Sequence, residues 1–197
     1  MNRHAPFRFI IFILFLAVIF VGCNNDSNPP VIMPLKIGNQ WTYENTLFAT
    51  NIYPIMRDTL ITKIVGDTIY QNEEWFKTSD NWYYSNRSNG AFLTFLPYKP
   101  SLIAKYPCFV GDTFYCEGYN TFKKVISTNG VVATSLGSFI CIQYRHTGID
   151  LSSNTSWYID EFYCPNYGLI REDYYHMNAS GQYVLDDQRV LIGMILK

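Results

Sequence analysis

Short runs of strand-forming residues constrain the fold of this chain more than any other feature. From Pro34 onward, segments rich in Tyr, Trp, Phe, Ile, Val and Thr alternate with Gly, Asn, Asp and Ser. β-branched and aromatic side chains favour extended backbone, and the small polar residues favour turns. No long window repeats apolar residues at helical spacing. The sequence therefore predicts an all-β domain, mostly an antiparallel open barrel or sandwich, with little helix beyond a signal peptide.

Turn chemistry sets the expected strand limits. Asn129 and Gly130 tolerate positive φ and separate two apolar runs, so they predict a hairpin turn. The segment 101–107, SLIAKYP, is the best candidate for a short turn of helix because Pro100 and Pro107 bracket it. The predicted strands are residues 40–46, 58–66, 68–79, 81–86, 91–97, 112–116, 121–128, 131–136, 138–146, 156–163, 167–177 and 182–196.

The first 23 residues have the organisation of a secretion signal. Arg3 and Arg8 form a basic start, and an uncharged run of 14 residues from Phe9 to Gly22 precedes Cys23. A membrane-spanning helix needs roughly 20 apolar residues, so this run is short for one. Residues 20–23, FVGC, resemble the bacterial lipobox. The resemblance implies cleavage before Cys23 and its acylation; an ordinary cleaved signal and a retained anchor are the alternatives.

The leader and the strand pattern together predict three parts. Residues 1–22 are a lipoprotein signal peptide, 23–33 hold the lipid-attachment cysteine and a flexible tether, and 34–197 form a single β domain. The tether sequence NNDSNPP is polar and rich in proline, so it buries little apolar surface. Resemblance to lipoproteins with a polar residue after the cysteine suggests the outer membrane. The leaflet that the domain faces stays open.

The charge balance argues against a nucleic-acid partner. The chain has 15 Lys and Arg against 16 Asp and Glu, and loss of the leader removes two Arg and no acid. Binding to phosphates requires clustered Lys and Arg, and no such cluster is visible. The expected partner is instead the membrane, reached through the lipidated Cys23.

Four cysteines remain for the domain: Cys108, Cys116, Cys141 and Cys164. An even number in an exported protein favours disulfides, and four cysteines allow three pairings. The preferred arrangement joins Cys108 to Cys116 and Cys141 to Cys164; the alternative is buried free cysteines acting as small hydrophobic residues. Their spacing does not suit a zinc finger, so no metal site is predicted.

The sequence carries none of the common catalytic motifs. The sequence has no nucleophile elbow, no zinc-protease motif, and no phosphate-binding or dinucleotide-binding glycine loop. His146 and His176 are more typical of ordinary strand residues than of catalytic ones. The acidic pairs 160–161, 172–173 and 186–187 sit on predicted strands or their ends, where adjacent side chains point to opposite faces. We expect no cofactor and a non-enzymatic role, with a hydrolase lacking a recognisable motif as an alternative.

Tyrosine is unusually frequent, since 16 Tyr exceed all Lys and Arg together. Its apolar ring and polar hydroxyl suit a surface that is partly wet, such as a glycan platform or a protein interface. Trp82, Tyr84, Trp157 and Tyr158 are the candidate binding aromatics. The alternative is ordinary aromatic packing within a barrel.

Four segments in order resemble landmarks of a group of uncharacterised bacterial lipoproteins: PLKIGNQWTYE, YPCFVGDTFYC, SLGSFICIQY and YCPNYGLIRED, at residues 34–44, 106–116, 135–144 and 163–173. The resemblance implies an open antiparallel barrel like those of lipoprotein carriers and lipid-binding periplasmic proteins, without an assigned activity. We therefore expect an envelope lipoprotein that binds an apolar or lipid ligand or serves as an envelope component. The alternative is a module that binds glycans or an envelope protein.

Overall fold

A computed structural model describes residues 31–50, 53–117, 121–150 and 154–197. These residues form the strands β1 (Gln40–Thr50), β2 (Tyr53–Tyr70), β3 (Glu73–Thr78), β4 (Tyr83–Arg87), β5 (Gly90–Thr94), β6 (Ser101–Lys105), β7 (Thr113–Cys116), β8 (Thr121–Thr134), β9 (Gly137–Asp150), β10 (Thr155–Cys164), β11 (Gly168–Met177) and β12 (Tyr183–Ile195).

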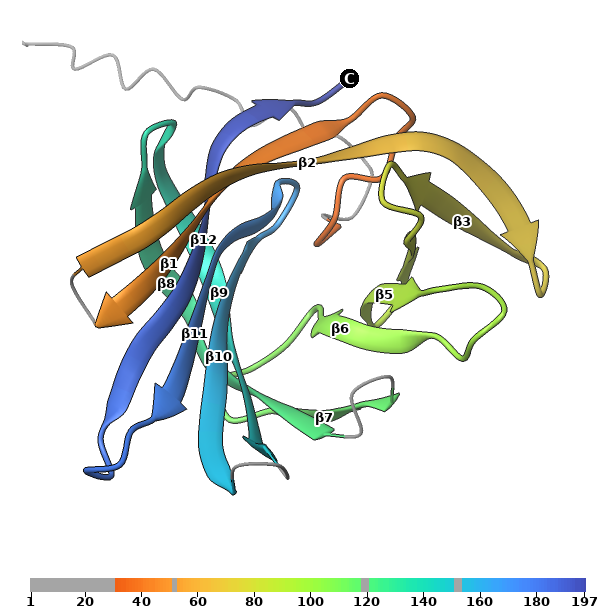
Figure 1. The fold of residues 1–197 in the computed structure, drawn as a ribbon. Coiled ribbons are helices and arrows are strands. Elements are labelled where there is room, and N and C mark those ends of the chain that lie inside the picture. The colour runs from red at the N-terminus through yellow and green to blue at the C-terminus, as the bar shows by residue number, and fades with distance from the viewer. Residues whose placement is uncertain (1–30, 51–52, 118–120, 151–153) are drawn as a thin grey trace, which may run out of the picture.

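The strands make one antiparallel sheet in the order β6-β5-β4-β3-β2-β1-β12-β11-β10-β9-β8-β7. Figure 1 shows this sheet curling until its two edge strands, β6 and β7, approach each other. The sheet therefore forms a nearly closed barrel. This confirms the prediction of an all-β, antiparallel fold, and of the two predicted architectures the protein adopts the barrel.

The barrel has two unlike walls. Strands β1, β2 and β8 to β12 contain 10 to 18 residues each and form what we call the long wall. Strands β3 to β7 contain only 4 to 6 residues each and form the short wall. Long ladders of backbone hydrogen bonds hold the long wall, whereas the short wall depends more on side chains.

Side chains close the seam between the edge strands β6 and β7. The thiol of Cys116 donates to the carbonyl of Leu102 at 2.9 Å, and the Lys123 ammonium donates to that of Ile103 at 3.0 Å. The Tyr144 hydroxyl donates to the carbonyl of Lys105 at 2.6 Å. Edge strands expose unpaired backbone groups, and these three bonds satisfy carbonyls that a further strand would otherwise satisfy.

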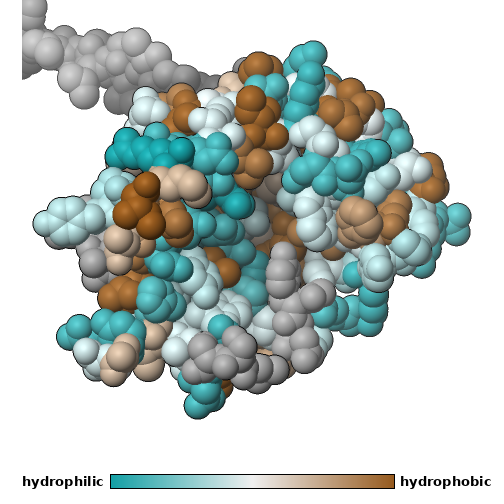
Figure 2. All heavy atoms as spheres, in the orientation of Figure 1, coloured by the Kyte–Doolittle hydropathy of each residue, from teal (hydrophilic) through white to brown (hydrophobic). Residues whose placement is uncertain are grey.

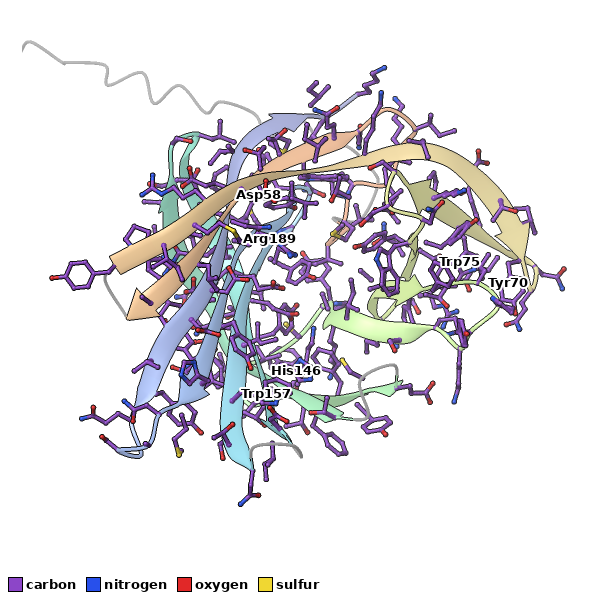
Figure 3. All side chains as sticks on the ribbon, in the orientation of Figure 1. Asp58, Tyr70, Trp75, His146, Trp157 and Arg189 are labelled. Carbon is purple, nitrogen blue, oxygen red and sulfur yellow. The ribbon has the colours of Figure 1, made fainter. Side chains whose placement is uncertain are left out.

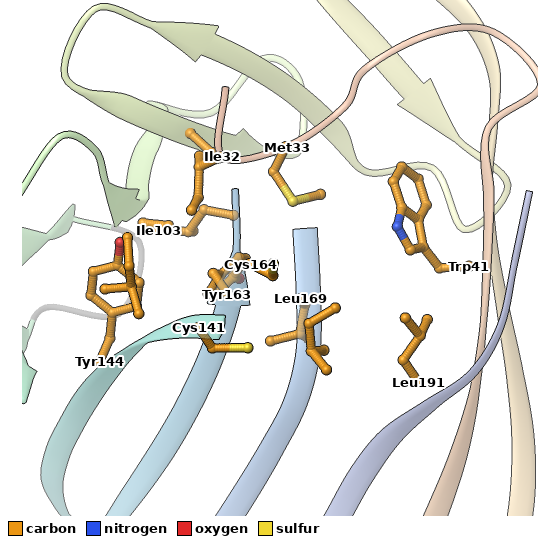
Figure 4. Close-up of a cluster of buried hydrophobic side chains, with 14 of the residues drawn as sticks. Ile32, Met33, Trp41, Ile103, Cys141, Tyr144, Tyr163, Cys164, Leu169 and Leu191 are labelled. Carbon is orange, nitrogen blue, oxygen red and sulfur yellow. The ribbon is translucent and has the colours of Figure 1, made fainter. Parts of the chain in front are cut away.

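The N-terminal segment packs into the core near the turn that joins the end of β10 to the start of β11. Ile32 and Met33 are buried and lie beside Cys164, Leu169 and Trp41 in Figure 4. The Trp41 indole nitrogen donates to the carbonyl of Tyr167 at 2.7 Å, which ties β1 to the β10–β11 turn. The packed domain therefore includes residues 31–33, three positions before the expected boundary at Pro34.

Three local expectations are wrong. Asn129 and Gly130 lie inside the continuous strand β8, where the register shifts against β9, and the chain reverses at residues 135–136 instead. The segment expected as helix is strand β6, because its backbone pairs with β5. The predicted strand 68–79 is broken by a turn at Gln71 and Asn72, whose φ values are 54° and 62°.

Candidate functional site

The barrel interior holds a polar cavity of about 240 Å³. Strand alternation creates it, because Glu161 and Tyr163 of β10 face inward while Asp160 and Phe162 face outward. Figure 2 shows the surface hollowed near its centre. The lining residues come from both walls: Leu60, Thr62, Asp80, Trp82, Tyr84, Leu93, Ile103, Lys123, Glu161, Tyr163, Leu169, Glu172 and Arg189.

Lys123 and Glu161 form a buried ion pair in this cavity. The Lys123 ammonium lies 2.5 Å from Oε2 of Glu161, and its side chain is 2% exposed. Burial alone would lower the pKa of Lys123, but the neighbouring Glu161 carboxylate outweighs it and raises that pKa above its usual value. Lys123 therefore keeps its charge, and burying a charged side chain is costly unless an opposite charge lies this close.

Arg189 and Glu172 supply a second, looser pair. Nη1 of Arg189 lies 3.5 Å from Oε1 of Glu172, and Nε of Arg189 donates to the side-chain oxygen of Asn45 at 3.1 Å. Burial raises the pKa of Glu172, Arg189 lowers it, and Glu161 raises it further, so the net direction is upward. Glu172 and Arg189 both line the cavity.

Tyrosine hydroxyls complete the polar lining. Burial is the main cause that raises the pKa of Tyr163 and of its neighbour Tyr43, so both stay neutral. The Tyr43 hydroxyl donates to the carbonyl of Leu169 at 3.1 Å, and Leu169 itself lines the cavity. Neutral hydroxyls can both donate and accept hydrogen bonds. The cavity therefore offers cations, carboxylates and hydroxyls together.

An apolar groove of about 340 Å³ adjoins the polar cavity. The Trp82 and Phe95 rings meet edge to face at 5.8 Å between centroids, and Phe95 lies 6.3 Å from Tyr98. Trp82 and Leu93 line both spaces, so the groove and the cavity meet at these two side chains. The remaining lining comes from residues 94, 99 and 101 of β5, β6 and their connection.

Trp157 packs on the lumen side of β10, farther toward the β9–β10 connection. Its indole meets His146 edge to face at 5.1 Å and stacks with Tyr174 at 6.1 Å. Figure 3 shows Trp157 and His146 close together, well away from Arg189. A side chain at Gly148 would collide with this indole, so the glycine makes the packing possible. Burial, with Lys123, lowers the pKa of His146 to about 4.

The four candidate binding aromatics do not share one surface. Trp82 and Tyr84 both line the polar cavity. Trp157 is packed as just described, and its neighbour Tyr158 points to the outer face, where it stacks with Tyr175 at 4.5 Å and meets Tyr183 at 4.8 Å. The structure thus brings together the first pair only.

The four domain cysteines are free thiols, so the expected disulfides are not formed. Cys116 bonds to the Leu102 carbonyl, and the Cys108 thiol lies 3.9 Å from the Tyr144 hydroxyl. Cys141 and Cys164 lie one position beyond the paired residues Ile142 and Tyr163 of β9 and β10. The Cys141 thiol donates to the carbonyl of Phe139 and the Cys164 thiol to that of Pro165. The interaction between the two thiols raises the pKa of Cys141 and lowers that of Cys164.

The adjacent acidic residues on β10 and β11 divide between the two faces. Glu161 and Glu172 enter the lumen, whereas Asp160 pairs outside with Arg145 at 2.6 Å and Asp173 with Arg171 at 2.8 Å. The sequence predicted this arrangement, because adjacent side chains on a strand point to opposite faces. Sequence reasoning missed the lumen role of Lys123, Glu161, Glu172 and Arg189, although charged residues within otherwise strand-like runs were a visible signal.

The two histidines of the domain lie in different surroundings. His176 lies 3.6 Å from Asp186 across β11 and β12, and His146 packs edge to face against Trp157. Within the described ranges, no group of three or more His, Cys, Asp or Glu residues could hold a metal ion. The same part of the chain contains no helix long and apolar enough to cross a membrane. Cys23 and the leader lie outside the described residues.

Two solved structures share this fold. A Bacteroides fragilis NCTC 9343 protein with a YmcC-like fold, inferred to be exported, superposes with a TM-score of 0.55 at 15% identity, covering 85% of this chain and 100% of that one. A Parabacteroides distasonis ATCC 8503 protein, inferred to be a lipoprotein, gives a TM-score of 0.53 at 13% identity with the same coverage. No protein-family model and no curated protein matches the sequence. The likeness establishes the barrel architecture.

Proposed function

We propose that this protein is an exported, lipid-anchored binding module that takes an amphipathic ligand. The polar head of the ligand lies among Glu172, Arg189 and the lumen hydroxyls, and its apolar part lies against Trp82, Phe95 and Tyr98. The observation that carries the proposal is the junction of a polar cavity and an apolar groove at Trp82 and Leu93.

The energetics of the lumen support a binding role. Burying charged side chains costs several kcal/mol per ion before pairing recovers it, so an interior built only for stability favours aliphatic packing. Here Lys123 and Glu161 satisfy each other, whereas Arg189 and Glu172 remain 3.5 Å apart. Ligand sites are typically roughly 300–1,000 Å³, mostly apolar, with a few placed polar groups. The combined groove and cavity match that description better than either does alone.

Export and anchoring rest on the leader. The basic start, the apolar run and the FVGC sequence favour acylation of Cys23, and both structural neighbours bear names that include export or lipoprotein. An acyl chain contributes about 0.8 kcal/mol per buried methylene to membrane binding. We propose the outer membrane as the destination.

The test is mass spectrometry of small molecules that copurify with the membrane-extracted protein. We expect an amphiphile in the wild-type protein and in Tyr115→Ala, whose ring lies on the exposed outer face of β7, and its loss in Trp82→Ala and Arg189→Met. Unfolding by urea checks that each variant is folded.

Three results would count against this function. One is a wild-type protein that carries no amphiphile and binds none from a panel of fatty acids, phospholipids and isoprenoid lipids. Another is equal retention in all the variants. A bound oligosaccharide without an apolar part would favour the glycan alternative instead.

A further inference from the structure

Exposed apolar residues gather at the end of the barrel where the described chain begins. Ile37 is 49% exposed and Ile195 is 51% exposed, and Val31 and Leu196 are exposed as well. Backbone pairing places Ile195 opposite Gln40, three residues after Ile37. We call Val31, Ile37, Ile195 and Leu196 the tether-end patch.

Basic side chains surround this patch. Lys36 and Lys197 are exposed, and Lys63 pairs with Gln40 from the other side of β1. The backbone nitrogen of Lys197 donates to the Asn39 side chain at 2.8 Å, which holds the chain after β12 beside the start of β1. Apolar side chains with lysines beside them suit the headgroup region of a bilayer, where anionic lipids attract basic residues.

The position of Val31 ties the same end to the proposed lipid anchor. Its backbone nitrogen donates to the Asn166 side chain at 3.2 Å, and its carbonyl accepts a bond from the Asn166 backbone at 2.7 Å. Seven residues, Asn24 to Pro30, separate Val31 from Cys23. The eight Cα-to-Cα steps from Cys23 to Val31 reach at most about 29 Å even when fully extended.

The barrel is about as long as this connection when it is fully extended. Strand β12 runs from Tyr183 to Ile195, and its 13 residues span roughly 40 Å at about 3.3 Å per residue. Because strands in a barrel tilt by about 35–45° from its axis, this strand covers roughly 30 Å along the axis. Tyr183 and Ile149 are exposed apolar residues at the opposite end, so apolar exposure alone does not select an end. The connection does select one, because the Tyr183 end could face the bilayer alone only if the tether were fully extended along the whole barrel, and a flexible polar chain is normally much shorter than its full extension.

We propose that the tether-end patch rests on the lipid bilayer to which Cys23 is anchored. This inference depends on the anchoring proposed above and adds the face that the barrel turns toward the lipid. The barrel end that carries Tyr183 then projects away from the membrane, toward the aqueous compartment.

Photochemical crosslinking to lipid tests the orientation on the full-length chain in its own membrane. Ile195→p-benzoylphenylalanine and Tyr183→p-benzoylphenylalanine place the same reactive group at the two ends of one strand, at positions of similar exposure. After illumination, we expect the variant at position 195 to form phospholipid adducts and the variant at position 183 to form none. Resistance to trypsin checks that both variants are folded.

The anchoring and the orientation fail in different ways. Anchored chains with equal adducts at both positions, or with adducts only at 183, overturn the orientation and leave the anchor intact. If wild-type protein is soluble, or if Cys23→Ser stays fully membrane-bound with its leader attached, the acyl-anchor proposal fails and the orientation argument fails with it.

Discussion

The long and short walls contribute different chemistry to the same lumen. Lys123, Glu161, Glu172 and Arg189 all come from β8 to β12, where extended ladders fix each strand against its neighbours. Trp82, Leu93 and the Phe95–Tyr98 connection come from the short wall. Rigid paired strands thus hold the charges, and short strands with their connections provide the apolar groove. Buried charges must be placed accurately, and the continuous pairing of long strands does this, whereas an apolar surface can be built from short strands and their connections.

The seam between β6 and β7 gives the largest expected effect. Lys123→Met should lower the free energy of unfolding by about 3–5 kcal/mol, because Glu161 would stay buried without its partner. The measurement is urea denaturation followed by tryptophan fluorescence. Lys99→Met is the matched control, since the ammonium of Lys99 pairs with Glu117 but is 76% exposed. Exposed pairs contribute only about 0–1 kcal/mol, so this variant should stay close to wild type.

A double variant sharpens the same point. Lys123→Met with Glu161→Leu removes both charges, and replacing a buried pair by apolar side chains is often neutral or stabilising. Its stability should therefore recover toward wild type. A double variant as unstable as Lys123→Met alone would show that the bond to the Ile103 carbonyl, rather than the ion pair, holds the seam.

Two glycines compare packing density at two positions of the long wall. Gly148→Ala in β9 should cost about 1–3 kcal/mol, because the added methyl group would overlap the Trp157 indole. Gly66→Ala lies where β2 passes from β1 to β3, and its added methyl would meet nothing within 4 Å. We expect the second change to stay within about 0.5 kcal/mol, as for surface substitutions. Equal effects in denaturation experiments would contradict the packing assigned to Trp157.

The smallest effect concerns pH. The folded protein has a His146 pKa of about 4, below the ordinary value of 6.5, so the unfolded chain binds the proton more readily. The resulting stability is complete above about pH 6.5 and is lost as the pH falls toward 4. Between pH 7 and 6 the loss should be up to about 0.7 kcal/mol.

His146→Gln separates this contribution from others. It should flatten the stability profile between pH 7 and 5, whereas His176→Gln, at a half-exposed position beside Asp186, serves as the control. Chemical denaturation across this range measures both slopes. An unchanged slope in His146→Gln would show that other groups cause the pH dependence.

Local chemistry predicted the class of fold but misplaced several turns. The alternation of aromatic and β-branched residues specified strands, and most of them appear close to the expected ranges. Asn129 and Gly130 failed as a turn because pairing with β9 holds both flanking runs in one strand. Residues 101–105 became strand β6 because β5 offers a ladder, and tertiary pairing overrides weak local preference.

The sequence by itself determined the β character, the balanced charge and the separation of adjacent acidic residues onto opposite faces, because these depend on composition and on the two-residue strand period. Only the tertiary structure decided that Lys123, Glu161, Glu172 and Arg189 share one cavity and that Trp82 joins it to a groove. Those contacts join residues far apart in the chain, and their positions follow from the order and register of the strands. For the same reason, Cys108 and Cys116 do not pair with each other. The Cys108 thiol lies beside the Tyr144 hydroxyl and the Cys116 thiol donates to the Leu102 carbonyl, because the closed barrel, rather than sequence spacing, decides which groups surround a thiol.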